Sequence, residues 1–259
     1  MRLAIVSDIH GNLPALEAVI AEIAQARVDA VLNLGDILSG PLWPLETARR
    51  LMALGWPTMR GNHERQVLED PRERMGASDA FAADALGEAE RAWLAGLPTS
   101  LRWAGGEVLA CHGTPGSDLH YLLETVTPGF GQHGSPGLRA ASPAEIEARL
   151  GGVHPPVLLC GHSHVPRVVQ SGATLIVNPG SVGLPAYDDV HPFPHDVETG
   201  SPHARWALLA RESTGWRAEQ RVTHYDHALS AARAEQAGRF DWADALRSGR
   251  VGRRENDAP

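Results

Sequence analysis

The chain has 259 residues, of which 43% are apolar and 21% are charged, so it is long enough to bury a sizeable core. Its formal net charge of −8 offers no basic surface, so we expect no polynucleotide as a partner. All 23 basic residues are arginine, which excludes lysine Schiff-base chemistry and a P-loop lysine.

The composition also bears on location and redox chemistry. No segment approaches 18 consecutive apolar residues, and the first residues lack a secretory-leader pattern, so we expect a cytoplasmic protein with no membrane partner. Cys111 and Cys160 are the only cysteines and lack the C-x-x-C spacing of a zinc site or a redox pair. We therefore expect both to be small buried thiols.

The first predicted unit is a strand, a polar turn and a helix. Residues 3–6 form a short apolar run that is typical of a buried strand. Asp8 and His10 follow at once, and side chains at i and i+2 of an extended segment point the same way, which favours chelation. Asn12 is expected to cap a helix from residue 13 to about residue 25.

Polar residues also follow the next predicted strands. The elements expected up to residue 110 are a strand at 30–34, a helix at 45–54, a short strand at 57–60, a helix at 77–96 and strands at 101–103 and 107–110. Asp36 follows the first of these strands, Asn62 and His63 follow the second, and His112 follows the last. Strands that alternate with helices favour an α/β fold, in which ligands collect beyond the carboxyl ends of the strands.

The second half of the chain contains two long segments without clear periodicity, at 115–141 and 185–204, which we interpret as lid or substrate-specificity loops. The elements expected around them are a helix at 142–150, strands at 157–159 and 175–177, a hairpin at 206–210 and 216–222, and one or two helices at 226–246. We expect one domain over 1–246, followed by a polar, frayed tail at 247–259. His133, His191, His195 and His203 lie on predicted loops without ligand spacing and are expected to be solvated.

Five short polar blocks stand at strand ends in this order: Asp8-x-His10, Gly35-Asp36, Gly61-Asn62-His63-Glu64, His112-Gly113 and Gly161-His162-x-His164. Each block alone is weak, because an isolated Asp or Asn after a strand is usually a turn or cap residue. Together and in this order, they resemble the signature of the calcineurin-like metallophosphoesterase superfamily. The resemblance implies a four-layer α/β/β/α sandwich of two mixed β-sheets flanked by helices, with a binuclear metal centre.

The resemblance also implies a role for each polar residue. It assigns Asp8, His10 and His164 to one metal ion, Asn62, His112 and His162 to a second ion, and Asp36 to both. His63 would contact the phosphate or leaving group as a catalytic residue together with Asp36, and Asn12 would also reach the phosphate. Glu64 is left as a charge at the start of a helix, at most beside the ligands.

The chemistry of this residue set agrees with the implied centre. A bridging ligand needs two anionic oxygens, which Asp36 has and histidine lacks. Nitrogen and oxygen donors without thiolate suit two divalent transition-metal ions, Mn, Fe, Co, Ni or Zn, of which we favour Mn. Such a pair clamps the attacking and leaving oxygens and generates hydroxide at neutral pH, so we expect metal-bound hydroxide to attack phosphorus and His63 to assist departure of the alkoxide.

One block departs from the protein phosphatases of the superfamily. Their motif after the second strand reads G-D-x-V-D-R-G, in which the second Asp orients the catalytic His and the Arg binds phosphate. Ser39 and Gly40 stand at those two positions, so what orients His63 is left open. The form G-D-x-x-x-G-P resembles the small bacterial and archaeal phosphoesterases, often described as phosphodiesterases.

These observations predict a phosphodiesterase that acts on a small phosphoester substrate, possibly a nucleotide. Only Arg60, Arg65 and Arg167 lie near the motifs as candidate phosphate clamps, and a diester needs less charge neutralised than a monoester. The alternatives are a phosphomonoesterase, a protein phosphatase-like enzyme, and a non-catalytic scaffold of the same fold. The oligomeric state is not predicted.

Overall fold

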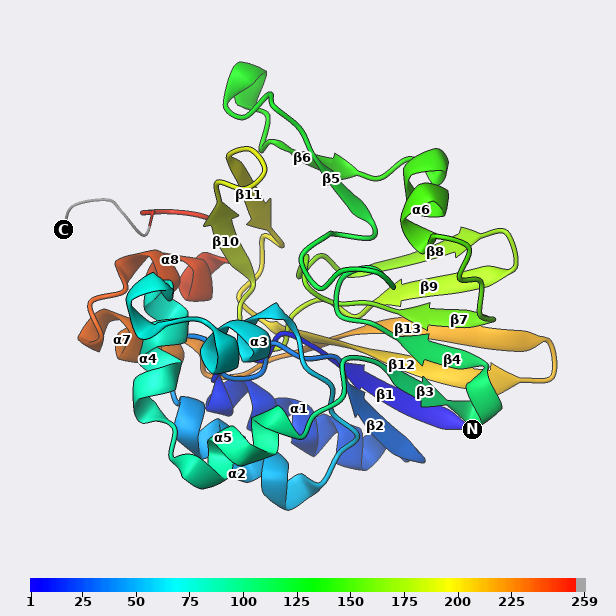
Figure 1. Cartoon of the computed structure of the whole chain (residues 1–259), viewed down its shortest axis with the longest axis horizontal. Helices are drawn as coiled ribbons and strands as arrows, with labels where there is room; N and C mark the ends of the chain where they lie inside the picture. The colour runs from blue at the N-terminus through cyan, green and yellow to red at the C-terminus, as the bar shows by residue number, and fades with distance from the viewer. Residues whose placement is uncertain (255–259) are drawn as a thin grey trace.

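Two mixed β-sheets pack face to face in the computed structural model, which describes residues 1–254 (Figure 1). The first sheet has the order β13 (Gly215–Thr223), β12 (Ala204–Glu212), β1 (Arg2–Val6) and β2 (Ala30–Asn33). The second sheet has the order β3 (Leu101–Trp103), β4 (Val108–Ala110), β7 (Val157–Leu159), β9 (Thr174–Asn178) and β8 (Arg167–Ser171). Strand β1 pairs in parallel with β2, and β4, β7 and β9 are mutually parallel, so their carboxyl ends meet at one edge.

The alternation of side chains along β1 divides the core into two parts. Leu3 and Ile5 are fully buried against residues of the second sheet such as Val108. Ala4 and Val6 point the other way, into the helical layer. Both faces of β1 are apolar because each is covered, which explains the uninterrupted apolar run in the sequence.

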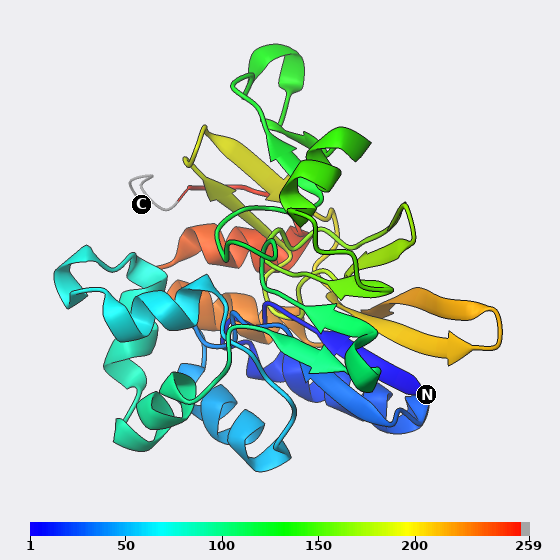
Figure 2. The ribbon, with the colours of Figure 1, turned by 45° about the vertical axis from the view of Figure 1, so that its right-hand side comes forward.

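Helices cover both outer faces, as the four-layer expectation requires (Figures 1 and 2). The outer face of the first sheet is covered by α1 (Leu13–Ala26), α2 (Pro44–Leu54), α3 (Asn62–Glu69), α4 (Ala77–Ala85) and α5 (Glu88–Ala95). The other outer layer is thin: α6 (Pro143–Leu150) packs Ile146 and Leu150 against Leu158 and Ile176 of the second sheet. The predicted fold class is therefore confirmed.

The two C-terminal helices pack beside the strand ends. Trp242 of α8 (Phe240–Ser248) is buried with Ala231 and Ala234 of α7 (His227–Gln236). The same tryptophan lies 5.9 Å from the ring of His10, centroid to centroid. The helix pair thus forms one wall of the region in which the polar motifs meet.

Several elements differ from the sequence-based expectation. The single helix expected at 77–96 is two helices, because Gly87 caps α5 and its N–H donates to the Glu90 carboxylate. The strand expected at 57–60 is reduced to one bridge between Asn33 and Thr58. Strand β8 was not predicted, and short 3₁₀ turns occupy Arg72–Arg74, Ala104–Gly106 and Gln132–Gly134.

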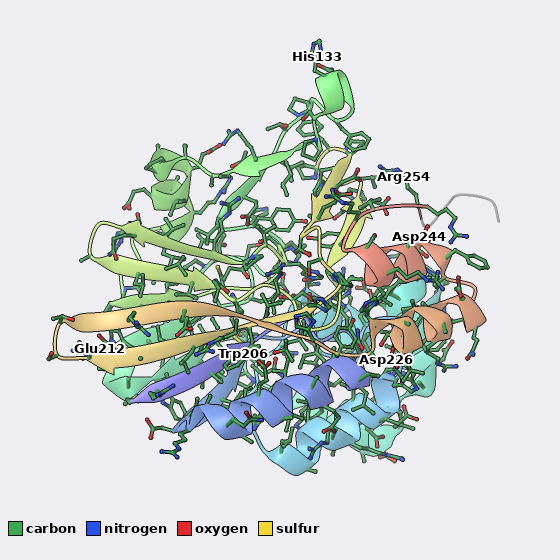
Figure 3. All side chains as sticks on the ribbon, turned by 180° about the vertical axis from the view of Figure 1, so that it is seen from behind. His133, Trp206, Glu212, Asp226, Asp244 and Arg254 are labelled. Carbon is green, nitrogen blue, oxygen red and sulfur yellow. The ribbon has the colours of Figure 1, made fainter. Side chains whose placement is uncertain are left out.

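Both segments expected to be loops contain a hairpin, formed by β5 (Glu124–Val126) with β6 (Leu138–Ala140), and by β10 (Ala186–Asp189) with β11 (His195–Glu198). The hairpins project together from one side of the sandwich (Figures 1 and 2). Asp196 N–H donates to the Pro136 carbonyl at 2.8 Å, which joins them. His133 lies at the apex of this projection, far from the strand ends (Figure 3).

The described part of the tail is held in place and not frayed. Arg254 pairs with Asp188 and Asp196 of the β10–β11 hairpin, and Arg253 pairs with Asp244 of α8. The remaining tail, residues 255–259, lies outside the described residues. None of the helices within 1–254 combines the length and apolar composition needed to cross a bilayer.

Candidate metal centre

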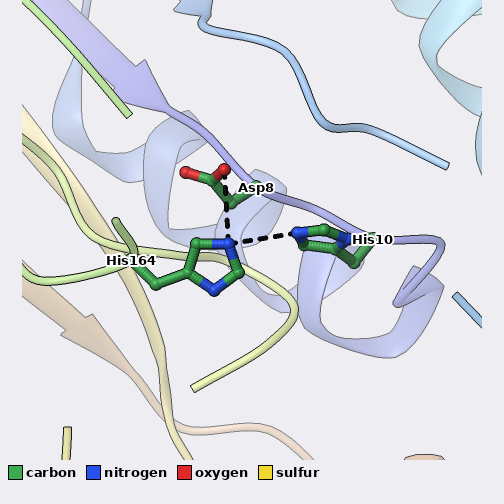
Figure 4. Close-up of side chains that lie close together, drawn as sticks. All are labelled: Asp8, His10 and His164. Atoms are coloured by element: carbon green, nitrogen blue, oxygen red, sulfur yellow. Dashed lines mark hydrogen bonds and ion pairs between the residues drawn. The ribbon is translucent and has the colours of Figure 1, made fainter. Parts of the chain in front are cut away.

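The first cluster of candidate ligands joins the loop after β1 to the loop after β7. The ligand atoms of Asp8, His10 and His164 all lie within 4.8 Å of one another. His164 Nε2 is 3.4 Å from Asp8 Oδ1 and 3.1 Å from His10 Nε2 (Figure 4). All three side chains are buried.

A second cluster lies beside the first, built by the loops after β2, β4 and β7. The ligand atoms of Asp36, His112 and His162 also lie within 4.8 Å of one another. His112 Nε2 is 2.9 Å from Asp36 Oδ2 and 4.0 Å from Asp8 Oδ1. His112 therefore connects the two clusters, so segments more than 150 residues apart in sequence converge at one point.

The histidine hydrogen bonds show that the first cluster fits a cation. His10 Nδ1 contacts the Ser39 carbonyl at 2.7 Å, and His164 Nδ1 contacts the Leu184 carbonyl at 2.8 Å. A carbonyl only accepts, so each Nδ1 carries its hydrogen and the two Nε2 atoms are the ones that face each other. Two Nε2 atoms 3.1 Å apart need a positive charge between them, which either a shared proton or a metal ion supplies.

Two buried oxygens point to the same conclusion. Asp8 Oδ2 and Asn62 Oδ1 are buried and have no hydrogen-bond partner among the described residues. The Asn62 amide is oriented by its Nδ2, which donates to Gln66 Oε1 at 3.1 Å, so its oxygen is left free. Buried oxygens without partners are rare in folded proteins, and a metal ion would satisfy both.

Five of the candidate ligands have left-handed backbone conformations. The φ angles are 55° at Asp8, 51° at His10, 52° at Asp36, 65° at His162 and 56° at His164. Each such conformation costs on the order of 1–3 kcal/mol and typically occurs where function requires it. The expected reason for the convergence of Asp8 and His10 was wrong: β1 ends at Val6, and a sharp turn, not strand alternation, brings them together.

The motif glycines allow the loops to approach closely. A Cβ on Gly61 would lie 2.2 Å from Asp36 Oδ1 and 2.8 Å from His112 Cε1. A Cβ on Gly161 would lie 2.9 Å from Asp8 Oδ2. All three distances are shorter than real Cβ atoms make, so any larger residue would displace a candidate ligand.

Glu64 contributes more to the site than the sequence indicated. Its carboxylate is 1% exposed and accepts the backbone N–H groups of Asp36, Ile37 and Gly61, each at 2.8 Å. Burial and the Asp36 carboxylate raise its pKa, which the three N–H bonds oppose. Through these three hydrogen bonds, Glu64 holds the loop after β2 against the start of α3, which carries Asn62 and His63.

His63 lies at the edge of the clusters, and its ring has a partner that the sequence did not reveal. Its Nδ1 is 2.7 Å from the Asp79 carboxylate of α4. Burial opposes its protonation, but the Asp36 and Asp79 carboxylates outweigh that effect and raise its pKa to about 10. The backbone N–H of His63 donates to Asp36 Oδ1 at 3.0 Å, which also holds that carboxylate.

The other imidazoles differ in electrostatic character. Burial and the neighbouring His164 lower the pKa of His10 to about 3, and burial and His112 lower that of His162 to about 4. Burial also disfavours protonation of His112, yet Asp36 raises its pKa to about 9. Conversely, burial would raise the pKa of Asp36, but His112 and His63 hold it well below its ordinary value. Neutral His10 and His162 beside an ionised Asp36 offer the protonation states that metal ligands need.

The structure does not place Asn12 in contact with the cavity. Asn12 is fully buried; its Nδ2 donates to the Gly183 carbonyl at 2.8 Å, and its Oδ1 accepts from Ser230 Oγ at 2.8 Å. It also caps α1 through the Ala15 N–H, as predicted. These polar atoms already serve the fold, and the contact of Asn12 with phosphate stays a prediction.

A cavity of about 1000 Å³ opens over the clusters, and the two hairpins wall it. Tyr121 and Tyr187 line it, and their hydroxyls are 2.7 Å apart. The Tyr121 ring packs on His162 and the Tyr187 ring on His164. His195 was expected to be solvated, but it is fully buried and bonds to the Tyr121 hydroxyl at 3.1 Å.

Comparison with known proteins agrees with this geometry. A family model described as the calcineurin-like phosphoesterase superfamily domain matches residues 1–199. Phosphodiesterase YfcE of Escherichia coli K12 is 28% identical over 195 residues, which cover 71% of this chain and 81% of that protein. An uncharacterised protein of Methanocaldococcus jannaschii is 24% identical over 209 residues, which cover 71% of this chain and 76% of that protein.

A solved structure shares the whole architecture. The crystal structure of a metallophosphoesterase from Sphaerobacter thermophilus has a TM-score of 0.72 and 23% identity, and covers 96% of this chain and 99% of that one. This likeness shows the fold. The chain belongs to the calcineurin-like phosphoesterase superfamily and is a phosphoric ester hydrolase. Its relatives belong to the small bacterial and archaeal branch that the motif forms predicted, and the family implies divalent metal ions.

Proposed function

We propose that the protein is a metal-dependent phosphodiesterase that uses two divalent ions held side by side. The observation that carries this proposal is the adjacency of the two ligand clusters, which His112 joins through its 4.0 Å approach to Asp8. One cluster alone would be compatible with a structural ion. Two clusters at the edge of an open cavity are typical of hydrolytic two-metal sites.

The residues that would hold the ions follow from the clusters. Asp8, His10 and His164 would hold one ion, Asn62, His112 and His162 the other, and Asp36 both. His162 Nε2 donates to the Leu119 carbonyl at 3.1 Å, which leaves Nδ1 with the lone pair for a metal. Asn62 joins the second set through its free buried Oδ1.

The donor set favours a transition metal over magnesium or calcium. Imidazole nitrogens and carboxylate or amide oxygens, without thiolate, suit Mn, Fe, Co, Ni or Zn, and we favour Mn. When bound, such ions neutralise charge on the phosphoryl group and make a water nucleophilic at neutral pH. His63 lines the cavity beside the clusters, where it can contact the leaving oxygen.

The arginines favour a diester over a monoester. Arg65 forms a bidentate pair with Asp118, and Arg167 pairs with Glu124, so neither of these candidate clamps faces the cavity. Three arginines do line it, and each already has a partner: Arg149 donates to the Glu124 carbonyl, Arg239 pairs with Asp241, and Arg253 pairs with Asp244. A doubly charged phosphate would lack a dedicated guanidinium clamp, whereas a singly charged diester needs less compensation.

The cavity volume supports a substrate with a sizeable organic part. A space of about 1000 Å³ lies at the upper end of small-molecule pockets and exceeds what a simple phosphate ester fills. Aromatic rings of Tyr121, Tyr187 and Trp242 line it. These features fit a small nucleotide-like diester, which we propose as the substrate class.

The test compares bis(p-nitrophenyl) phosphate with p-nitrophenyl phosphate, each with Mn²⁺ and after chelation, together with metal analysis of the same preparation. We expect faster turnover of the diester, loss of activity on chelation, and a loss of more than about 100-fold in Asp36→Asn. Asp84→Asn, an exposed site on α4, is the control and should behave like the wild type.

Each other outcome rejects part of the proposal. Faster monoester turnover would make the protein a phosphomonoesterase. Wild-type rates in Asp36→Asn would remove the mechanism. No bound or bindable metal would favour a non-catalytic scaffold.

A further inference from the structure

We propose that Asp79 is the positioning residue of His63: its carboxylate fixes the imidazole so that Nε2 faces the cavity. The inference deepens the proposed function and rests on it for the role of His63. Its basis is the contact between His63 Nδ1 and Asp79 Oδ1 at 2.7 Å, in which the Asp79 side chain is 7% exposed and that of His63 is 28% exposed.

The contact defines the orientation of the ring. Because a carboxylate only accepts, Nδ1 carries the hydrogen, and Nε2 is the atom left for another partner. His63 Nε2 has no hydrogen bond to any residue within 1–254, and the residue lines the cavity. The Asp79 carboxylate, in turn, bonds to no side chain except His63 in the described part of the chain.

The position of Asp79 is itself fixed from two sides. The preceding residue, Ser78, accepts the Gly40 N–H through its carbonyl at 3.3 Å. Its hydroxyl accepts from Arg239 Nη1 at 3.0 Å. The start of α4 is therefore bonded to both the loop after β2 and the C-terminal helices. These two bonds fix the backbone beside Asp79 and so keep its carboxylate next to His63.

The loop after β2 cannot supply such a carboxylate in this chain. Ser39 turns its carbonyl toward His10, and its own hydroxyl is buried without a partner among the described residues. A Cβ on Gly40 would lie 2.6 Å from the Trp242 ring, so no side chain fits there. The carboxylate for His63 comes instead from Asp79 of α4, which lies 16 residues after His63 in the chain.

A simpler role for Asp79 must be separated from this one. Asp79 lies in the first turn of α4, where an acidic side chain stabilises a helix by about 0.3–1 kcal/mol through the helix dipole. That effect would not depend on His63. The positioning role requires that the effect of Asp79 vanish when the imidazole is absent.

The kinetic test uses the full-length Mn²⁺-loaded protein and two diesters, diphenyl phosphate with a poor leaving group and bis(p-nitrophenyl) phosphate with a good one. We expect Asp79→Asn to lower kcat about 100-fold on the first and less than about threefold on the second, with KM unchanged. In a His63→Ala background, Asp79→Asn should cause no further loss. Equal losses on both esters, or an undiminished loss in that background, would overturn the proposal.

A second readout does not depend on turnover. In ¹⁵N-histidine spectra of the full-length Zn²⁺-loaded protein, the His63 Nδ1–H should appear as a downfield, slowly exchanging signal that His63→Gln removes. Asp79→Asn should abolish or shift it, whereas Asp84→Asn, on the same helix but exposed, should not. An unchanged signal in Asp79→Asn would overturn the proposal even if no diester is hydrolysed, a failure that would count against the proposed function alone.

Discussion

The carboxylate of Glu64 holds the backbone of Asp36: Glu64 Oε2 accepts the Asp36 N–H at 2.8 Å, and both residues are buried. The same oxygen accepts the Gly61 N–H, also at 2.8 Å. One oxygen thus joins the loop that carries the proposed bridging ligand to the turn that carries Asn62 and His63. The geometry of the metal centre depends on a residue that contacts neither cluster as a candidate ligand.

Glu64→Gln should therefore destabilise the protein and weaken metal binding. An amide group in place of Oε2 leaves two buried N–H groups without an acceptor, and each such group costs about 1–3 kcal/mol. We expect the free energy of unfolding, measured by urea titration of chelated protein, to fall by about 2–4 kcal/mol. Glu69→Gln, at an exposed position of the same helix, should change it by less than about 0.5 kcal/mol. Equal stability of the two variants would show that Glu64 does not hold the loops.

Gly61→Ala should abolish the binding of at least one metal ion without unfolding the chain. The new methyl group would lie 2.2 Å from Asp36 Oδ1, so the carboxylate must move away from the position in which it would hold the two proposed ions. Isothermal titration with Mn²⁺ should show loss of at least one of the two sites, while the circular dichroism spectrum is retained. Gly76→Ala is the matched control, since a Cβ there meets open space. Tight binding of two ions by Gly61→Ala would contradict the proposed role of Asp36.

The sequence was most informative where chemistry and spacing coincide. The five polar blocks predicted which loops converge. The alternation of strands and helices predicted an α/β fold, and the family resemblance implied the four-layer sandwich. The sequence could not reveal Asp79, because it lies in an alanine-rich helix with no motif, and its contact with His63 exists only after α4 docks. The role of Glu64 is similar: an acidic residue at the third position of a helix is ordinary until burial and three N–H donors are seen.

The hairpins were missed for a different reason. Strands β5, β6, β10 and β11 are three or four residues long, and their pairing is stabilised by contacts between the hairpins and with the tail. Such short strands carry too little periodicity to be recognised among Gly, Pro and Ser. His195 can be buried because both of its ring nitrogens are hydrogen-bonded. Nε2 bonds to the Tyr121 hydroxyl, and Nδ1 bonds to the Phe193 carbonyl.

The two cysteines should be unreactive in the folded protein. Burial raises the pKa of the Cys111 thiol to about 12 and that of Cys160 well above its ordinary value. The thiolate is the reactive form, so native protein at pH 8 should react with iodoacetamide at least about 100-fold more slowly than urea-unfolded protein.

The same pKa shift has a consequence for stability. The folded-state pKa of Cys111 lies above the ordinary value of 9.0, so the stabilisation is complete below pH 9 and is lost as pH rises toward about 12. Cys111→Ala should lose less stability than the wild type over this range in urea titrations. In the alkylation experiment, rapid reaction of the native protein with iodoacetamide at pH 8 would show that the two thiols are not buried.

The central claim is that two ions lie side by side at the strand ends, between the loops that follow β1, β2, β4 and β7. Anomalous diffraction from a crystal grown with Mn²⁺ tests it most directly. The account predicts two peaks roughly 3.5–4 Å apart. One should lie against Asp8, His10 and His164, the other against Asn62, His112 and His162, with Asp36 touching both. A single peak, or peaks that lie away from Asp36, would contradict it.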